Sequence, residues 1–307
     1  MNIYEELRSK LQKSAERNKA DGILLSGGLD TSILAFIARP RVGFTVALKD
    51  SPASDLVYSE KISKLLGIKY KKMEFTKEEA LAMLPEVIRI LRTFDLALPN
   101  DLAIYFALKL AKGNKISSVM TGDGSDELFA GYSYMAGLPP EDLERYIRRL
   151  SGNWHFSSGY LGRALGVEVK QPFLDDDFVC FALQISPELK VKDGLGKYIL
   201  RKSFEDLIPG DIVWRKKEPI EYGSGFTRLH EITNNMVTET EFQSVTNKLD
   251  IKFLNKEHFF YWRIYNEVVG EIPKVKDGEM RCPCCGAGMG TYHCRTCGFS
   301  RPLKECL

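Results

Sequence analysis

One stretch decides the fold of this chain: Ser26-Gly27-Gly28-Leu29-Asp30-Thr31-Ser32. It follows the short apolar run 21–25 and precedes a helical pattern over 31–38 that ends before Pro40. A strand that enters a helix through two glycines places free backbone N–H groups and the positive end of a helix dipole beside any bound anion. The stretch therefore predicts a phosphate-binding loop, although a Gly-Gly turn before a helix is by itself more often only a tight turn.

The side chains of this loop indicate which phosphate chemistry it suits. The loop has neither the lysine of the G-x-x-x-x-G-K-[ST] loop nor the third glycine of the dinucleotide fingerprint. Asp30 instead favours a phosphate bridged by magnesium, because a bare carboxylate would repel it, and the hydroxyls of Thr31 and Ser32 can donate to phosphate oxygens. The residues match the signature SGGxDS of the PP-loop ATP-pyrophosphatases, with Thr31 in the first of the two hydroxyl positions.

A second polar loop follows another apolar strand pattern, which ends at Met120. Residues 121–127 read Thr-Gly-Asp-Gly-Ser-Asp-Glu and include three carboxylates: Asp123, Asp126 and Glu127. A solvated turn that caps the next helix would explain this composition. A magnesium–nucleotide site would also explain it, since the metal offsets the repulsion between the acids. The two interpretations are compatible.

Strand and helix patterns alternate around these loops. Strands are expected at 21–25, 42–48, 70–75 and 117–120, and helices at 3–18, 31–38, 55–66, 77–93 and 101–112. This alternation predicts an α/β fold with a doubly wound, mostly parallel sheet, whose ligands sit beyond the carboxyl ends of the strands. No strand pattern is found over 141–269, where 143–150, 197–207 and 255–268 look helical. We therefore expect an N-terminal helix (1–18), an α/β core (19–140), a helical part (141–271) and a cysteine-rich module (276–307).

Cysteines are concentrated at the carboxyl end of the chain. Two C-x-x-C pairs, Cys282–Cys285 and Cys294–Cys297, are each followed by a glycine and are separated by eight residues, which is the form of a zinc ribbon. The spacing predicts one closed Zn²⁺ site made by Cys282, Cys285, Cys294 and Cys297, structural rather than catalytic. Cys284 and His293 could substitute as ligands, but they break the paired spacing.

Composition limits the function classes. With 307 residues, 44% of them hydrophobic, the chain can form one large core and a small appendage. The formal net charge of +2 does not favour a nucleic-acid surface. The chain begins without an apolar stretch of signal-peptide length and has none long enough to span a bilayer. These features predict a cytoplasmic location.

Five motifs in the same order resemble the synthetase domain of the glutamine-dependent asparagine synthetases and their relatives. They are SGGLDTS at 26–32, TGDGSDELFAGY at 121–132, KQPFLD at 170–175, GKYILRKSF at 196–204 and WRKKEPIEYGSG at 214–225. The resemblance covers residues 20–230 and implies that ATP is split into AMP and pyrophosphate. By the resemblance, Asp30 and Asp126 bind Mg²⁺, and Lys197 holds the leaving pyrophosphate. Asp123 stands where the family has a glutamate that takes a proton from the incoming amine. The residues expected to contact ATP are Ser26, Gly27, Gly28, Asp30, Thr31, Ser32, Val46, Leu48 and Gly122, of which Val46 and Leu48 offer backbone groups to adenine.

The chain also departs from that family. Residues 94–101 replace the family's substrate segment, which carries an arginine suited to binding a carboxylate, and this weakens the case for aspartate as the acceptor. Lys170 stands where arginine is usual. The chain has no room for a glutaminase domain, so we expect it to take ammonia or an amine from a separate donor protein rather than from glutamine.

The main hypothesis is an ATP-dependent, AMP-forming carbon–nitrogen ligase that adenylates a small-molecule carboxylate. The alternative is a PP-loop enzyme that adenylates a tRNA base for sulfur or nitrogen transfer. Such enzymes use further cysteines in the catalytic part, where only Cys180 is present, in an apolar run that predicts a buried thiol. A non-catalytic scaffold is a third possibility, disfavoured by the complete set Asp30, Asp126 and Lys197.

Overall fold

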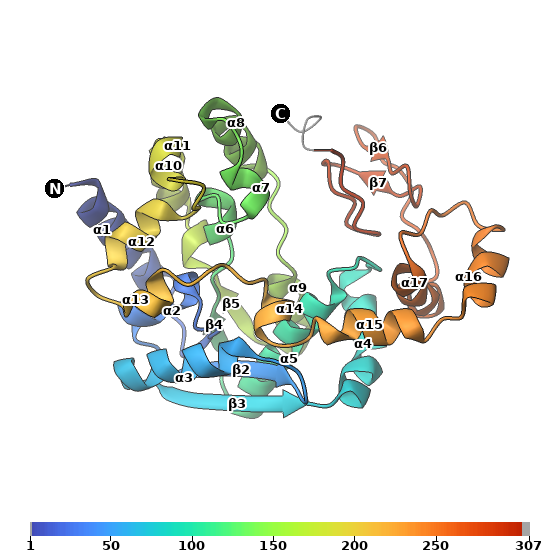
Figure 1. Ribbon diagram of the computed structural model, residues 1–307, viewed down its shortest axis with the longest axis horizontal. Coiled ribbons are helices and arrows are strands. Elements are labelled where there is room, and N and C mark those ends of the chain that lie inside the picture. Colours follow the sequence, from blue (N-terminus) through green and yellow to red (C-terminus); the bar gives the residue numbers. More distant parts are fainter. Residues whose placement is uncertain (1, 303–307) are drawn as a thin grey trace.

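A five-stranded parallel sheet forms the centre of the protein, as a computed structural model of residues 2–302 shows (Figure 1). The strands are β1 (Gly22–Leu24), β2 (Val42–Leu48), β3 (Lys69–Phe75), β4 (Ser118–Met120) and β5 (Glu168–Lys170), in the spatial order β3-β2-β1-β4-β5. Every neighbouring pair is parallel. The predicted α/β class and the four predicted strands are confirmed. Met1 and the last residues of the expected cysteine module, 303–307, lie outside the described residues.

The sequence explains which strands are central. Every residue of β2 is buried, because helices cover both faces of the sheet and an apolar run without alternation suits that position. β3 is mostly exposed or half-buried and occupies one edge. One core joins β2 to α4, α5, α9 and α17, and a second joins residues around β1 to α1, α2, α10 and α12. The longer helices are α1 (Ile3–Arg17), α2 (Leu29–Ala38), α3 (Ser54–Leu66), α4 (Lys77–Leu91), α5 (Leu98–Gly113), α8 (Pro140–Ser151), α9 (Ser157–Leu165), α10 (Asp176–Gln184), α12 (Tyr198–Phe204), α15 (Arg228–Asn235), α16 (Glu239–Thr246) and α17 (Lys256–Val268).

Several short elements connect these helices and strands. They are α6 (Ser125–Leu128), α7 (Ser133–Ala136), the 3₁₀ turn η1 (Pro172–Leu174), α11 (Pro187–Lys190), α13 (Gly210–Val213) and α14 (Ile220–Gly223). Among residues 2–302, no helix is both long and apolar enough to cross a membrane.

The expectation of no strand over 141–269 is wrong. β5 pairs with β4 and extends the sheet at its second edge. It has only three residues, Glu168, Val169 and Lys170, and none is fully buried, so neither length nor apolar pattern marks it in the sequence. The prediction for Cys180 is also wrong: its thiol is exposed on α10, while Phe178, two residues earlier, is buried.

The cysteine module forms a small hairpin of β6 (Met280–Arg281) and β7 (Gly288–Met289) beside α17 (Figure 1). This module packs against the rest of the protein. Cys282, Cys285, Cys294 and Cys297 belong to the same buried cluster as residues of α4, α5 and α17. The backbone N–H of Phe94 donates to Thr296 O at 2.8 Å. We call residues 280–302 the ribbon.

Candidate active site

The two polar loops meet where the strand order reverses. From β1 the chain proceeds outward to β2 and β3, and it returns to β4 on the other side of β1. The loops after β1 and β4 therefore leave neighbouring strands at the same edge and diverge, which is where open parallel sheets bind ligands. Their contact is close: a Cβ atom at Gly122 would lie 3.0 Å from Cβ of Asp30. The predicted position of both loops is confirmed.

The first loop has the backbone geometry of an anion site. Gly27 has φ +69°, and a Cβ atom there would lie 2.4 Å from Ser59 N, so glycine is required. α2 begins at Leu29, two residues before the expected start, and within the described chain no side chain caps its first N–H groups. Ser26 Oγ lies 3.1 Å from Thr31 Oγ1 and accepts from Gly28 N at 3.2 Å. The hydroxyls and free amides of this loop thus gather at one helix N-terminus.

A buried lysine joins the two loops. Lys197 Nζ lies 2.7 Å from Asp30 Oδ2 and 2.7 Å from Asp126 Oδ1. Ser125 Oγ donates to Asp30 Oδ1 at 2.7 Å. Lys217 Nζ lies 3.0 Å from Asp126 Oδ2. Burial alone would raise the pKa of Asp126, but the charges of Lys197 and Lys217 outweigh it and lower that pKa to about 2. Asp126 is therefore a carboxylate at neutral pH.

The backbone conformation of residues 196 and 197 places Lys197 next to the second loop. Lys197 has φ 57°, in the left-handed region, at the start of α12, and its N–H donates to Phe129 O at 2.8 Å. A Cβ atom at Gly196 would lie 1.8 Å from Ala130 O. The glycine before the lysine is therefore needed for this segment to approach the second loop.

A second cluster surrounds Asp123, for which the family resemblance implies a position on the amine side of the reaction. Asp123 Oδ2 accepts hydrogen bonds from Thr121 Oγ1 at 2.6 Å, Ser158 Oγ at 2.5 Å and Gln171 Nε2 at 2.9 Å. Next to Ser158, Ser157 interacts with Asp101, whose side chain is buried at the start of α5, and lowers its pKa. We call the following residues the Asp123 cluster: Asp101, Thr121, Asp123, Ser157, Ser158 and Gln171.

Asp101 makes the stability of the protein depend on pH. Burial, and to a smaller degree the charges of Asp95 and Glu221, raise its pKa, whereas hydrogen bonding with Ser157 and Asn100 lowers it, and the net result is a pKa of about 7. The unfolded chain releases this proton near pH 4, so between about pH 4 and 7 the folded state binds more protons and its stability falls as pH rises. The slope from this group is at most about 1.4 kcal/mol per pH unit. Asp55, whose pKa is also raised to about 7, contributes in the same range, so in Asp101→Asn the decline measured by denaturant unfolding from pH 4 to 8 should become smaller by the share of Asp101. An unchanged profile would contradict the assignment.

The two residues expected to offer backbone groups to adenine, Val46 and Leu48, both lie in β2. The N–H of Leu48 donates to Ser224 O at 2.9 Å, so it is not free for a base. The 224–225 turn lies close to this end of β2: Gly225 has φ +78°, and a Cβ atom placed on it would lie 3.6 Å from Leu48 O. Val46 is buried in β2.

The contact of Lys217 with Asp126 was missed by sequence reasoning. Lys217 belongs to the WRKKEPIEYGSG motif, but charged residues are common in exposed segments and nothing local singles it out. Arg215 anchors this segment: its guanidinium lies 3.3 Å from Asp55 Oδ1 and 4.1 Å from the centre of the Tyr58 ring. Only this long-range packing shows that Lys217 reaches Asp126.

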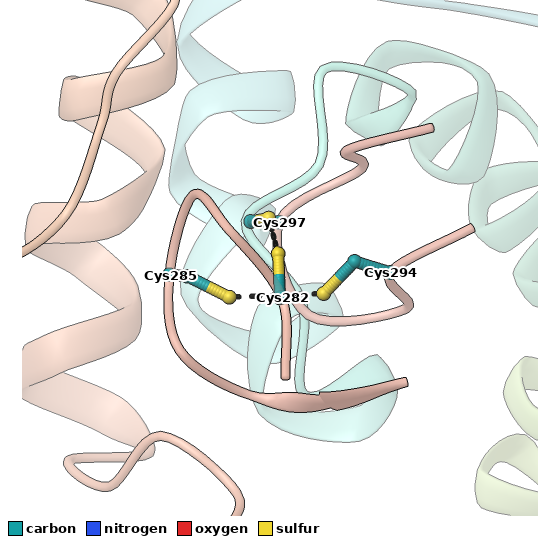
Figure 2. Close-up of side chains that lie close together, drawn as sticks. All are labelled: Cys282, Cys285, Cys294 and Cys297. Atoms are coloured by element: carbon teal, nitrogen blue, oxygen red, sulfur yellow. Dashed lines mark hydrogen bonds between the residues drawn. The ribbon is translucent and has the colours of Figure 1, made fainter. Parts of the chain in front are cut away.

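The four predicted thiol ligands point to a common centre (Figure 2). Their Sγ atoms all lie within 4.8 Å of one another, and the Cys282–Cys297 and Cys285–Cys294 pairs are 3.6 and 3.7 Å apart. A tetrahedron of sulfurs at about 2.3 Å from zinc has edges of about 3.8 Å. The geometry therefore fits a four-thiolate metal. Of the other candidate ligands, Cys284 donates its N–H to Cys282 Sγ at 3.4 Å, and His293 Nε2 faces Asp95 at 3.4 Å.

Comparison with known proteins gives one consistent family. The sequence profile of the family described as "Asparagine synthase" matches residues 6–161 and 157–271. The asparagine synthetase (glutamine-hydrolyzing) of Bos taurus is 32% identical over 282 residues, which are 83% of this chain and 50% of that protein. Asparagine synthetase B of Escherichia coli (strain K12) is 29% identical over 297 residues, which are 86% of this chain and 53% of that protein. The chain thus spans about half the length of the curated relatives it matches.

Similar solved structures are distant. The U34-tRNA thiolase NcsA from Methanococcus maripaludis, with its [4Fe-4S] cluster, is 16% identical with a TM-score of 0.34, covering 94% of this chain and 84% of that one. The NMN synthetase from Francisella tularensis is 15% identical with a TM-score of 0.33, covering 89% and 97%. Likenesses of this size carry no argument about function.

Proposed function

The chain belongs to the asparagine synthase family, and we propose that it activates a substrate carboxylate by forming an acyl-adenylate and then an amide. The observation that carries the proposal is the junction of Asp30, Asp126, Lys197 and Lys217 at the switch point of the sheet. Two carboxylates that face two lysines suit a site where a magnesium-bound polyphosphate is broken, because negative charge grows on the leaving group there.

The first step forms the acyl-adenylate. A carboxylate oxygen attacks the α-phosphorus of ATP, the bond between that phosphorus and the bridging oxygen breaks, and pyrophosphate leaves with the electron pair. Asp30 and Asp126 would hold Mg²⁺, which would supply positive charge beside the phosphates. Lys197 and Lys217 donate to the leaving pyrophosphate, and the free amides at the start of α2 hold it beside the first loop.

The second step forms the amide. An amine nitrogen attacks the acyl carbon, the bond from that carbon to the AMP oxygen breaks, and the nitrogen loses a proton. Asp123 can take this proton on Oδ1, because Oδ2 is occupied by three donors and Oδ1 has none among the described residues. We propose that the nitrogen comes from ammonia or from an amine delivered by a separate partner.

The alternative of tRNA modification has weaker support. Cys180 lies exposed on α10 beside residues of α1 such as Lys10 and Lys13, not with Asp30 and Asp126. Neither the family match nor the site supplies a sulfur-carrying thiol in the catalytic part. We therefore keep amide formation as the proposed function, and we propose that the thiols of the ribbon hold a structural Zn²⁺.

Product analysis tests the function. The full chain is incubated with ATP labelled at the α-phosphate, Mg²⁺, ammonium and single candidate carboxylates. At least one acid should give labelled AMP and pyrophosphate in equal amounts, and the amount of amide formed should equal that of AMP. Release of labelled ADP in the acid-dependent reaction would overturn the proposal. Asp126→Asn is the matched negative control, because it removes a carboxylate of the junction with little change in shape.

A further inference from the structure

The ribbon touches the segment in which this chain departs from its family. Thr296 O, one residue before the ligand Cys297, accepts from Phe94 N at 2.8 Å and from Thr93 Oγ1 at 3.3 Å. A Cβ atom at Gly298, one residue after Cys297, would lie 2.2 Å from Asp95 Oδ1. The turn that carries Cys297 therefore packs directly on residues 93–95.

These residues lead to the Asp123 cluster by a short series of contacts. Asp95 Oδ1 accepts from Ala97 N at 3.1 Å, just before α5. The first turn of α5 carries the buried Asp101, whose carboxyl group interacts with Ser157. The next residue, Ser158, donates to Asp123. A displacement of residues 93–97 would therefore shift the first turn of α5, which lies in the segment 94–101 that replaces the family's acceptor-binding segment. It would also shift Asp123, which we place beside the acyl carbon of the acceptor that the amine attacks.

The ribbon also contacts the other segment that leads to this cluster. The guanidinium carbon of Arg149, in α8, lies 3.8 Å from the centre of the Tyr292 ring. Further along, burial and the positive charges of Arg295 and His293 lower the pKa of His155 to about 4. His155 precedes Ser157 by two residues. The ribbon thus contacts the α4–α5 connection through Thr296 and α8 through Tyr292, and its charges act on the α8–α9 connection.

We propose that the metal-bound ribbon positions the acceptor-binding side of the active site by holding residues 93–97 and 149–155 on either side of the Asp123 cluster. The proposal rests on the proposed function for the meaning of "acceptor", but its structural part does not. A ribbon that served only as a separate binding module would not need its ligand turn inside the core shared by α4, α5 and α17.

Hydrogen exchange on the full chain tests the structural part without any turnover. Metal is first measured in the purified protein, where one ion per chain is expected, and is then removed with a chelator. Exchange should rise at the Phe94 amide and over residues 155–158, and it should stay unchanged at the Leu25 amide, which donates to Phe44 O in the sheet. A rise confined to residues 273–302 would overturn the proposal, and this result does not depend on the identity of the substrate.

A double variant tests the catalytic part with the metal in place. Asp95→Asn removes the negative partner of His293 but keeps an oxygen for Ala97 N, and Arg149→Met removes the contact with Tyr292. With an acceptor found as above, the KM for the acceptor should rise about tenfold, while the KM for ATP and the metal content stay the same. Arg145→Met, which removes an exposed pair with Asp142 on the same helix, is the control. Equal changes in both KM values would contradict a positioning role; so would no change in either.

Discussion

Replacing Lys197 by methionine is expected to lower kcat for pyrophosphate release by at least about a hundredfold. The ammonium is buried and pairs with Asp30 and Asp126 at 2.7 Å each. Methionine removes this positive charge, and a water molecule in its place would not restore it. As pyrophosphate leaves, its negative charge increases. A donor fixed beside it therefore stabilises the transition state more than the ground state and lowers the barrier. Rapid-quench assays of pyrophosphate formation at saturating ATP measure the effect.

Loss of folding must be separated from loss of catalysis in this variant. Breaking a buried ion pair leaves carboxylates without a partner and can cost about 3–5 kcal/mol of stability. Lys217 still faces Asp126 at 3.0 Å and limits this cost. Denaturant unfolding therefore accompanies the kinetics, and assays are done where the variant is folded. The control is Lys192→Met, because Lys192 is an exposed lysine shortly before Lys197 in the sequence. A folded Lys197→Met protein with near-normal kcat would refute the assigned role.

Lys197→Arg sharpens the same test. Arginine keeps the charge, but its planar guanidinium is wider than an ammonium and must fit between two carboxylates in a buried site. We expect activity well below that of the unchanged protein, because a point charge rather than a fork matches this geometry. Activity close to normal would mean that only the net charge matters.

Much of the site could be predicted because its parts are local. A strand followed by Ser26-Gly27-Gly28, and another followed by acidic residues, identifies two loops without any knowledge of packing. Parallel strands then bring their carboxyl ends to one edge, so the meeting of the loops follows from the fold class. Cysteine spacing predicts the four-thiol set in the same way, because both pairs lie within short turns.

The remaining features depend on contacts between distant segments. Lys217 reaches Asp126 only because Arg215 anchors its segment on Asp55, 160 residues away in sequence. β5 is too short and too polar to produce a pattern, and it forms because β4 offers it a pairing edge. The contact of Thr296 with Phe94 involves backbone groups, which leave no trace in residue types.

Gly131→Ala is the second change with a large expected effect, and it tests whether the junction tolerates displacement. A Cβ atom at Gly131 would lie 1.9 Å from Asp126 Oδ1 and 2.4 Å from Lys197 Cε, far inside contact distance. The added methyl group must therefore push the carboxylate or the lysine away, although neither residue is changed chemically. We expect kcat to fall about a hundredfold and stability to fall by about 1–3 kcal/mol.

The control for this prediction is another glycine in the same chain. Gly113→Ala, at the end of α5, places a methyl group with no heavy atom within 4 Å, so it should leave activity unchanged and the fold at least as stable. If Gly131→Ala kept normal pyrophosphate release, the ion pairs at Lys197 could be moved without cost, and precise placement of the lysine would not be what the second loop provides. If both variants lost activity equally, the effect would be general to the fold. The expected contrast between them would instead locate it at the meeting point of the Ser26–Ser32 loop, the second loop and Lys197.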